Sequence, residues 1–354
     1  MKRGAHSPTG FHWHSAQAPI WGMDNAERVR RLACAARIQP PEGRTLRVNL
    51  AYAFDPLLMR LALRHPDKRF THGEDFVIGV DGGTEMVDLA TRPEFYNAQL
   101  RKIERPFAIR LTPQSRADAE RASYDASYKG VTDLLTKYLW PGLAFHLTRL
   151  AAALRMSPNV VTAIGAALCV WAFFLFWQGR YWEGMAAGFV FMVLDTVDGK
   201  LARCTITSSW WGNIFDHGID LVHPPFWWWA WAMGLGSWGL AYSTPTFLWV
   251  MGAILGGYVI QRLIEGGFMR LYGGIHIHVW ERFDSRFRLV TARRNPNMVI
   301  LFVATLAARP DIGLIAVAWW TAISCAVHGV RLVQAMMRAR GGEAIGTWLE
   351  ETRG

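Results

Sequence analysis

The stretch DTVDGKLARCTITSSWWGNIFDHGID, residues 195–220, places four aspartates in an otherwise apolar part of the chain. They form two pairs, Asp195 with Asp198 and Asp216 with Asp220. Each spacing puts both carboxylates on one face of a helix. Two such faces turned together gather negative charge that is unfavourable unless cations neutralise it. Ligation by oxygen alone favours Mg²⁺, Mn²⁺ or Ca²⁺ over zinc.

The same stretch carries a signature: Asp, two residues, Asp-Gly, two residues, Ala-Arg, eight residues, Gly, three residues, Asp, three residues, Asp. It resembles the CDP-alcohol phosphotransferase (CDP-alcohol phosphatidyltransferase) family, over roughly the C-terminal 200 residues. The resemblance implies a membrane-embedded transferase of phospholipid biosynthesis. Such an enzyme moves a substituted phosphate from a CDP-alcohol, such as CDP-diacylglycerol or a CDP-polyol, to a hydroxyl acceptor and releases CMP. At least one of the two substrates is expected to be a lipid.

The resemblance also assigns roles to the motif residues, with two Mg²⁺ or Mn²⁺ ions as cofactors. Asp220 is implied to be the general base as well as a metal neighbour. The implied metal ligands are Asp195, Asp198, Asp216 and Asp220. The implied nucleotide-binding residues are Gly199, Ala202, Arg203 and Gly212, together with Asn159 and Thr162 from a Pro-Asn-x-x-Thr segment. Capping of the helix that follows is an equally good interpretation of Asn159 and Thr162.

Three arginines outside the motif, Arg262, Arg293 and Arg294, are predicted to bind an acidic acceptor. Snorkelling to the membrane surface is the alternative for Arg293 and Arg294. Arg262 has a buried ion pair with Glu265 as its alternative. His276 and His278 alternate in a loop, which favours a surface strand over a metal site because no third ligand accompanies them.

Composition favours a membrane protein. Hydrophobic residues make up 51% of the 354 and charged residues only 19%, and there are 18 tryptophans, a residue that gathers at membrane interfaces. The net charge of +10 raises nucleic-acid binding as a rival. No zinc-finger or RRM signature supports that rival, and the arginines flank apolar segments, so an anionic lipid surface explains them better and no nucleic acid partner is expected. The four cysteines are interpreted as free thiols.

Six spans are predicted, at 159–178, 182–199, 212–234, 246–269, 296–309 and 312–335. An interfacial amphipathic helix over 140–154 precedes them. Pro224 and Pro225 are expected to break or kink the third span. The distribution of Lys and Arg between the loops places both termini and the active site at the cytoplasmic face of the cytoplasmic membrane. The fold class is therefore an α-helical integral membrane protein.

A small N-terminal α/β cytosolic module is predicted over 46–115, with strands at Leu46–Phe54 and Asp75–Val80 and helices at Pro56–Arg64 and Thr84–Glu104. It faintly resembles a degenerate nucleotidyltransferase, and an unrelated α/β cap is as good an interpretation. The remaining divisions are a poorly ordered segment 1–45, linking and interfacial helices 116–156, a six-helix membrane domain 157–340 and a tail 341–354.

Two other functions are consistent with the residues alone. A transporter also carries acidic residues at membrane depth, although no inverted repeat is visible. A catalytically inactive lipid-binding scaffold has no reason to keep four costly aspartates. A homodimer is expected from the family. The sequence does not identify the alcohol of the donor or the acceptor.

Overall fold

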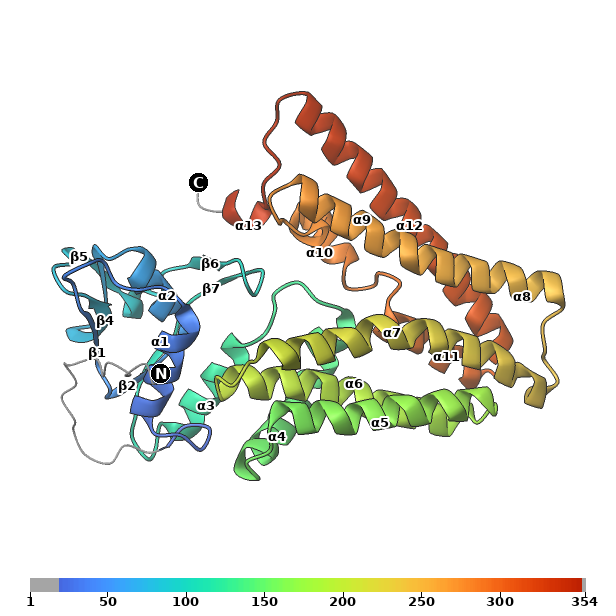
Figure 1. Ribbon diagram of the computed structural model, residues 1–354, viewed down its shortest axis with the longest axis horizontal. Coiled ribbons are helices and arrows are strands. Elements are labelled where there is room, and N and C mark those ends of the chain that lie inside the picture. The colour runs from blue at the N-terminus through green and yellow to red at the C-terminus, as the bar shows by residue number, and fades with distance from the viewer. Residues whose placement is uncertain (1–18, 352–354) are drawn as a thin grey trace, which may run out of the picture.

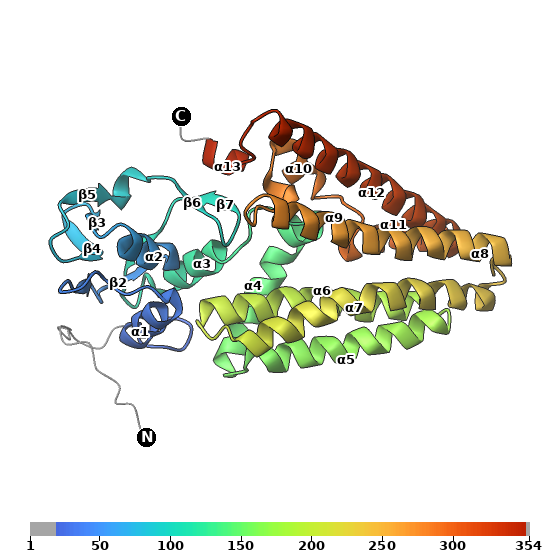
Figure 2. The same cartoon turned by 45° about the horizontal axis from the view of Figure 1, so that its top comes forward.

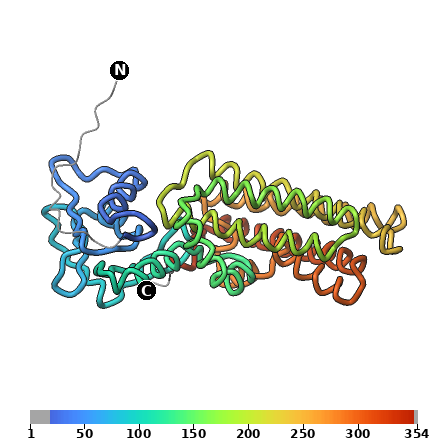
Figure 3. The backbone as a smooth tube through the Cα atoms, turned by 90° about the horizontal axis from the view of Figure 1, so that it is seen from below, coloured from blue at the N-terminus to red at the C-terminus, as the bar shows by residue number. Residues whose placement is uncertain are grey.

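Residues 19–351 are described by the computed structural model, in which a small α/β module lies at one end of a long set of helices (Figure 1). The tube in Figure 3 shows the same arrangement from a second direction, with the module at one end and the helices extending away from it. The aspartate motif belongs to the helical part, and the end of the helices that carries it faces the module.

The module is built around a four-stranded sheet of order β1-β4-β3-β5, in which only β3 and β5 run parallel. Helix α2 packs on β3 and β4, and Asp55 caps its start by accepting a hydrogen bond from the Leu57 amide at 2.8 Å. Two further ladders pair β2 with β8 and β6 with β7. The elements are α1 (Asn25–Ala36), β1 (Leu46–Val48), β2 (Tyr52–Phe54), α2 (Pro56–Arg64), β3 (Lys68–His72), β4 (Asp75–Val80), β5 (Glu85–Asp88), the 3₁₀ turn η1 (Leu89–Thr91), β6 (Phe95–Asn97), β7 (Lys102–Glu104) and β8 (Ala108–Arg110).

The module and the segment before it depart from the sequence prediction at three places. The strand predicted over Leu46–Phe54 is instead two strands, β1 and β2, which belong to different sheets. The helix predicted over Thr84–Glu104 is wrong, because this segment forms β5, η1, β6 and β7. Pro93 cannot continue a helix, and the aromatic pair Phe95 and Tyr96 suits a strand. The segment predicted to be poorly ordered contains helix α1, capped by the Asp24 side chain; residues 1–18 of that segment lie outside the described residues. Helix α2 and strand β4 have the predicted bounds.

Helices follow the module for the rest of the described chain. They are α3 (Arg116–Ala126), the π turn η2 (Leu135–Leu139), α4 (Trp140–Ala153), α5 (Pro158–Trp177), α6 (Tyr181–Cys204), α7 (Trp210–Gly234), the 3₁₀ turn η3 (Leu235–Trp238), α8 (Thr244–Met251), the π turn η4 (Gly252–Gly256), α9 (Gly257–Leu271), the 3₁₀ turn η5 (Ile277–Val279), α10 (Arg282–Phe287), α11 (Arg294–Leu306), α12 (Pro310–Arg340) and α13 (Trp348–Glu351). Helix α7 is continuous through Pro224 and Pro225, so the span is not broken there. A kink at these prolines stays a prediction.

Three helical segments of the described residues are long and apolar enough to cross a membrane: Pro158–Trp177, Thr244–Leu271 and Pro310–Arg340. The protein is therefore an integral membrane protein that is mostly helical. The other three predicted spans are helical too, as α6, α7 and α11. Helix α11 has 13 residues, about 20 Å at 1.5 Å per residue, which is shorter than a bilayer core of about 30 Å. The count of six spans remains a prediction.

The helix ends next to the site are fixed by local chemistry. Ser157 and Ser209 cap α5 and α7 by accepting hydrogen bonds from the amides of Val160 and Gly212, at 3.3 and 3.0 Å. At the opposite end, α5 and α7 approach so closely that a Cβ added at Gly234 would lie 2.0 Å from the Phe176 carbonyl oxygen. These contacts hold α5 and α7 side by side, with α6 packed on α5.

Candidate metal and nucleotide site

Three of the four motif aspartates converge. One carboxylate oxygen from each of Asp195, Asp216 and Asp220 lies within 4.8 Å of the other two. Asp195 comes from the C-terminal half of α6, and Asp216 and Asp220 come from successive turns at the start of α7. The helical spacing predicted for the two pairs is therefore present, and the two helices turn these carboxylates toward each other.

Asp198 lies deeper than the other three, with an exposed fraction of 3%. The Thr162 hydroxyl on α5 donates a hydrogen bond of 2.5 Å to Asp198 Oδ2. Asp198 Oδ1 is buried and has no hydrogen-bond partner in the described residues. A buried carboxylate oxygen without a partner is costly, so this atom suits a ligand that the structure does not contain.

Arg294 joins the two ends of the aspartate cluster. Its guanidinium contacts Asp195 Oδ2 and Asp220 Oδ1, both at 2.7 Å, and lies 4.9 Å from the centre of the Phe191 ring. Each of the two carboxylates keeps a second oxygen outside this contact. Arg294 was predicted to bind an acidic acceptor, and in this structure its charge is directed at the aspartates instead.

The residues predicted to bind a nucleotide surround the aspartates. A Cβ at Gly212 would lie 2.7 Å from Asn159 Oδ1, so the start of α7 lies directly against the Asn159 side chain of α5, which would have to move for a larger residue. A Cβ at Gly199 would lie 3.1 Å from the guanidinium of Arg203, whose Nε is buried and has no hydrogen-bond partner within residues 19–351. The Ala202 carbonyl accepts the Thr207 amide at 2.9 Å and shapes the turn between α6 and α7.

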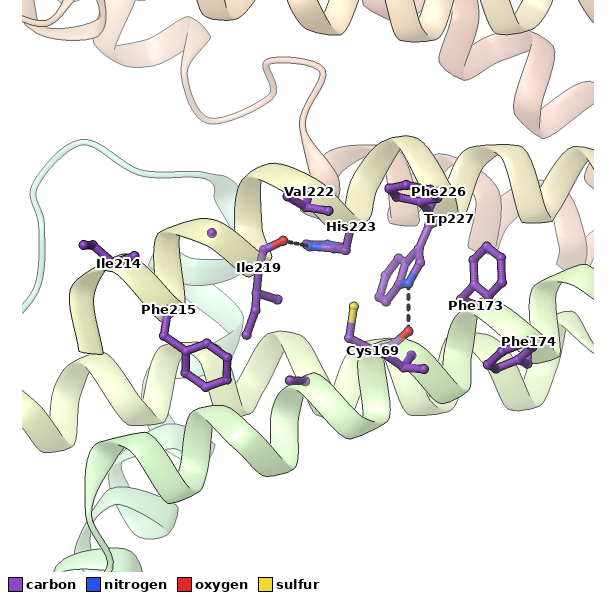
Figure 4. Close-up of a pocket in the computed structure, with 13 residues that line it drawn as sticks. Cys169, Phe173, Phe174, Ile214, Phe215, Ile219, Val222, His223, Phe226 and Trp227 are labelled. Carbon is purple, nitrogen blue, oxygen red and sulfur yellow. Dashed lines mark hydrogen bonds between the residues drawn. The ribbon is translucent and has the colours of Figure 1, made fainter. Parts of the chain in front are cut away.

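Two pockets adjoin the cluster. The smaller one is a narrow crevice with essentially no room for a water molecule, lined by Thr162, Gly165, Phe191, Asp195, Asp198, Asp216 and Ile219. The larger one, of about 670 Å³, lies between α5 and α7 (Figure 4). Its walls are almost entirely apolar, and Phe215, Ile219 and Trp227 are among the side chains directed at it (Figure 4). Polar and apolar surfaces thus meet along one face of α7.

The other two arginines predicted to bind an acceptor converge on Glu265 rather than on the aspartates. Glu265 Oε1 accepts hydrogen bonds from Arg262 at 3.0 Å and Arg293 at 2.5 Å. The contacts of Arg262 therefore agree with the alternative interpretation, an ion pair with Glu265. Tyr258, one turn before Arg262, donates to the Leu221 carbonyl at 2.8 Å and ties this group to α7 beside Asp220.

The prediction of a surface strand for His276 and His278 is wrong. His278 lies in the 3₁₀ turn η5, is 2% exposed, and contacts Glu265 at 3.3 Å. Burial lowers the pKa of His278 well below its usual value, so the ring is neutral. Glu265 therefore has its charge balanced by the two arginines.

Comparison with known proteins matches this region. The family model for CDP-alcohol phosphatidyltransferase covers residues 155–283, which include all four motif aspartates. The chain carries a CDP-alcohol phosphatidyltransferase domain. Arg293 and Arg294 lie beyond the matched residues, although Arg294 completes the aspartate cluster of this domain.

Several curated relatives are similar to part of this chain. An archaetidylinositol phosphate synthase of Pyrococcus horikoshii is 29% identical over 48% of this chain and 80% of its own length. A phosphatidylinositol phosphate synthase of Mycolicibacterium smegmatis is 30% identical over 40% of this chain and 65% of its own. A choline/ethanolaminephosphotransferase of Arabidopsis thaliana is 33% identical over 28% of this chain and 27% of its own. The chain spans about a quarter of the length of the first curated relatives that it matches.

Sequence reasoning offered Arg262 as a partner of Glu265 but missed the other partners of these acids. Arg294 lies 99 residues from Asp195 and 74 from Asp220, and His278 lies 13 from Glu265. No local spacing indicates such pairs. The one available signal was the shortage of basic residues near the motif, which required a cation from elsewhere in the fold.

Proposed function

We propose that this chain transfers a substituted phosphate from a CDP-alcohol to a hydroxyl acceptor and releases CMP, in phospholipid biosynthesis. The observation that carries the proposal is the convergence of Asp195, Asp216 and Asp220 within 4.8 Å, beside the partnerless oxygen of Asp198. The names of the relatives, which include synthases of inositol phosphate lipids and a choline/ethanolaminephosphotransferase, support this class of reaction.

The candidate ligand atoms suit hard divalent cations, since they are carboxylate oxygens. One of them, Asp198 Oδ1, is buried and has no hydrogen-bond partner among the described residues. In this proposal Asp195, Asp198, Asp216 and Asp220 hold two ions, either Mg²⁺ or Mn²⁺. When bound, such ions neutralise the diphosphate of the donor and stabilise the leaving CMP. Arg294 keeps Asp195 and Asp220 neutralised before ions arrive, which reduces the repulsion within the cluster.

Other steps of the proposed reaction, namely proton transfer and binding of the nucleotide, are assigned to individual residues. Asp220 has the most exposed carboxylate of the cluster, at 45% for the side chain, and is the proposed general base that takes the proton of the acceptor hydroxyl. Thr162 fixes the orientation of Asp198. Arg203 donates to a phosphate of the nucleotide. The small residues Gly199, Ala202 and Gly212, together with Asn159, leave room for the cytidine.

The apolar pocket between α5 and α7 supports a substrate that carries acyl chains, because its walls match hydrocarbon and it adjoins the aspartates. We place the active site and both termini at the cytoplasmic face, where the loops rich in Lys and Arg are expected. Six spans and a homodimer, as in the sequence prediction, complete the proposal.

The test is CMP release by the purified chain with Mn²⁺ and a panel of CDP-alcohols. Asp220→Asn should lower the rate by about 10²–10⁴-fold, the usual contribution of a general base. Asp125→Asn, an exposed aspartate on α3 that pairs with Arg121, is the matched control and should leave the rate unchanged. EDTA should abolish release.

Each part of the proposal has its own contradicting result. Release that survives Asp220→Asn removes the assigned base. Turnover that EDTA does not affect contradicts the two ions. Transport of a solute without CMP release would favour a transporter.

A further inference from the structure

The loop between α6 and α7 joins the two pairs of motif aspartates. It spans residues 205–209, between Cys204 at the end of α6 and Trp210 at the start of α7. Helices α6 and α7 both pack on α5, and this loop is the covalent link between the pair of aspartates on α6 and the pair on α7. The geometry of the cluster therefore depends on how the loop is held.

The backbone of the loop has an unfavourable conformation at Ile206. This residue has a φ of 53°, in the left-handed region, which is sterically unfavourable for a β-branched residue. A conformation of this kind persists where the surrounding contacts stabilise it. Inside the loop, the Thr205 and Thr207 hydroxyls share a hydrogen bond of 2.7 Å, and the Thr207 amide donates to the Ala202 carbonyl at 2.9 Å. Further contacts come from the module.

Helix α1 of the module contacts the loop at two adjacent residues. Figure 2 shows α1 beside the ends of α6 and α7 that the loop joins. Ile206 packs against the buried apolar cluster of the module, which includes Val29 and Leu32 of α1. Arg31 Nη1 donates a hydrogen bond to the Thr205 carbonyl at 2.9 Å. This cation lies at the C-terminal end of α6, where the helix dipole favours positive charge.

Arg31 is itself oriented by Glu27. Its Nε donates to Glu27 Oε1 at 2.7 Å, and the Glu27 amide donates to the Asp24 side chain that caps α1. Arg30 pairs with the other oxygen of the same Glu27, but its side chain is 71% exposed against 34% for Arg31. Among the described residues Arg30 makes no hydrogen bond to the loop. The two neighbouring arginines therefore differ in one respect that matters here, the contact with Thr205.

We propose that helix α1 of the module positions the two aspartate pairs by holding the loop between them, with Arg31 and Ile206 as the positioning residues. Carboxylates gathered in one place repel one another until cations bind, and Arg294 contacts two of the four. The remaining repulsion acts to separate α7 from α6, and the contacts of α1 with the loop oppose it. The module thus lowers the concentration of divalent ions that the site needs. That consequence rests on the proposed function; the holding of the loop does not.

The first measurement is amide hydrogen exchange of the full chain in detergent with EDTA, read at Thr205 and Thr207, whose amides are bonded to the end of α6. Arg31→Ala should speed this exchange about tenfold, the usual worth of one hydrogen bond from a charged group. Arg31→Lys, which keeps a charged donor, should recover part of the protection. Arg30→Ala is the matched control and should leave the exchange unchanged.

Ile206→Asn tests the apolar contact separately. Asparagine adopts the left-handed conformation more readily than isoleucine does, so the substitution relieves the backbone and removes the packing against the module. Faster exchange at Thr205 and Thr207 is expected. Slower exchange would overturn the role of Ile206, because the side chain would then strain the loop rather than hold it.

The second measurement is the Mn²⁺ requirement, followed directly from the electron paramagnetic resonance signal of free Mn²⁺ and also through CMP release. Arg31→Ala should need up to about tenfold more Mn²⁺ for half saturation. Its kcat at saturating Mn²⁺ should stay close to the wild-type value, because bound ions then hold the aspartates together. Arg30→Ala should match the wild type in both.

Three results would overturn the inference. One is unchanged exchange in Arg31→Ala, and another is an equal change in Arg30→Ala. The third is a lower unfolding midpoint of Arg31→Ala with an unchanged Mn²⁺ requirement, since α1 would then only stabilise the fold. Failure of the proposed function would appear separately, as no CMP release by the wild type, and would leave the exchange and Mn²⁺-binding results intact.

Discussion

Arg294→Met should destabilise the metal-free protein and increase its response to divalent ions. The substitution keeps most of the apolar stem and removes the guanidinium that joins Asp195 to Asp220. In the variant, no cation of the described residues forms an ion pair with Asp195 or Asp220. The expected result is lower stability in EDTA and a larger stabilisation by Mn²⁺ than in the wild type.

The magnitude follows from the burial of each contact. The side chains of Arg294 and Asp195 are 13% and 18% exposed, and breaking a buried pair of this kind costs about 3–5 kcal/mol. Asp220 is 45% exposed, so its contact adds only about 0–1 kcal/mol. Saturation of the aspartates with an ion at about 100 times its Kd returns about 2.7 kcal/mol. Mn²⁺ should therefore restore about half of the loss or more.

The assay is unfolding in detergent with EDTA and with Mn²⁺, for the wild type and the variant side by side. Arg309→Met is the control, because Arg309 also pairs with an aspartate, Asp311, but its side chain is half exposed; little change is expected. Equal stability of wild type and Arg294→Met in EDTA would refute the reasoning. So would a Mn²⁺ response no larger in the variant, since Arg294 would then not compete with ions.

Two further predictions concern stability alone. Gly234→Ala should cost about 1–3 kcal/mol by overpacking, because the new Cβ meets the Phe176 carbonyl, whereas Gly236→Ala, which meets nothing within 4 Å, should be nearly neutral in the same unfolding assay. Burial, and to a smaller extent the charge of Glu104, raises the pKa of Asp55 from 3.8 to about 7. The folded state therefore binds this proton more tightly than the unfolded state does. The free energy of unfolding should fall as the pH rises from 3.8 through about 7. Asp55→Asn, which keeps a capping oxygen, should flatten that fall, and parallel pH profiles of the unfolding midpoint would contradict it.

Local patterns in the sequence were enough to place the helices around the site. Ser157 followed by Pro158 set the start of α5, and the spacing of Asp216 and Asp220 set their common face on α7. The module was harder to predict, because Thr84–Glu104 contains three short strands, of which β5 pairs with β3 outside the segment while β6 and β7 pair with each other. Strand propensity is weaker than helix propensity as a local signal, since much of it reflects packing against neighbours.

By itself the sequence determined the chemistry of the acids and the membrane class of the fold. Both depend on residue type and on periodicity along one helix, which are local properties. The tertiary structure decided which cations meet those acids: Arg294 at Asp195 and Asp220, and Arg293 at Glu265. Charge pairing acts through space, so residues far apart in sequence become partners only when helix packing brings them within a few ångströms.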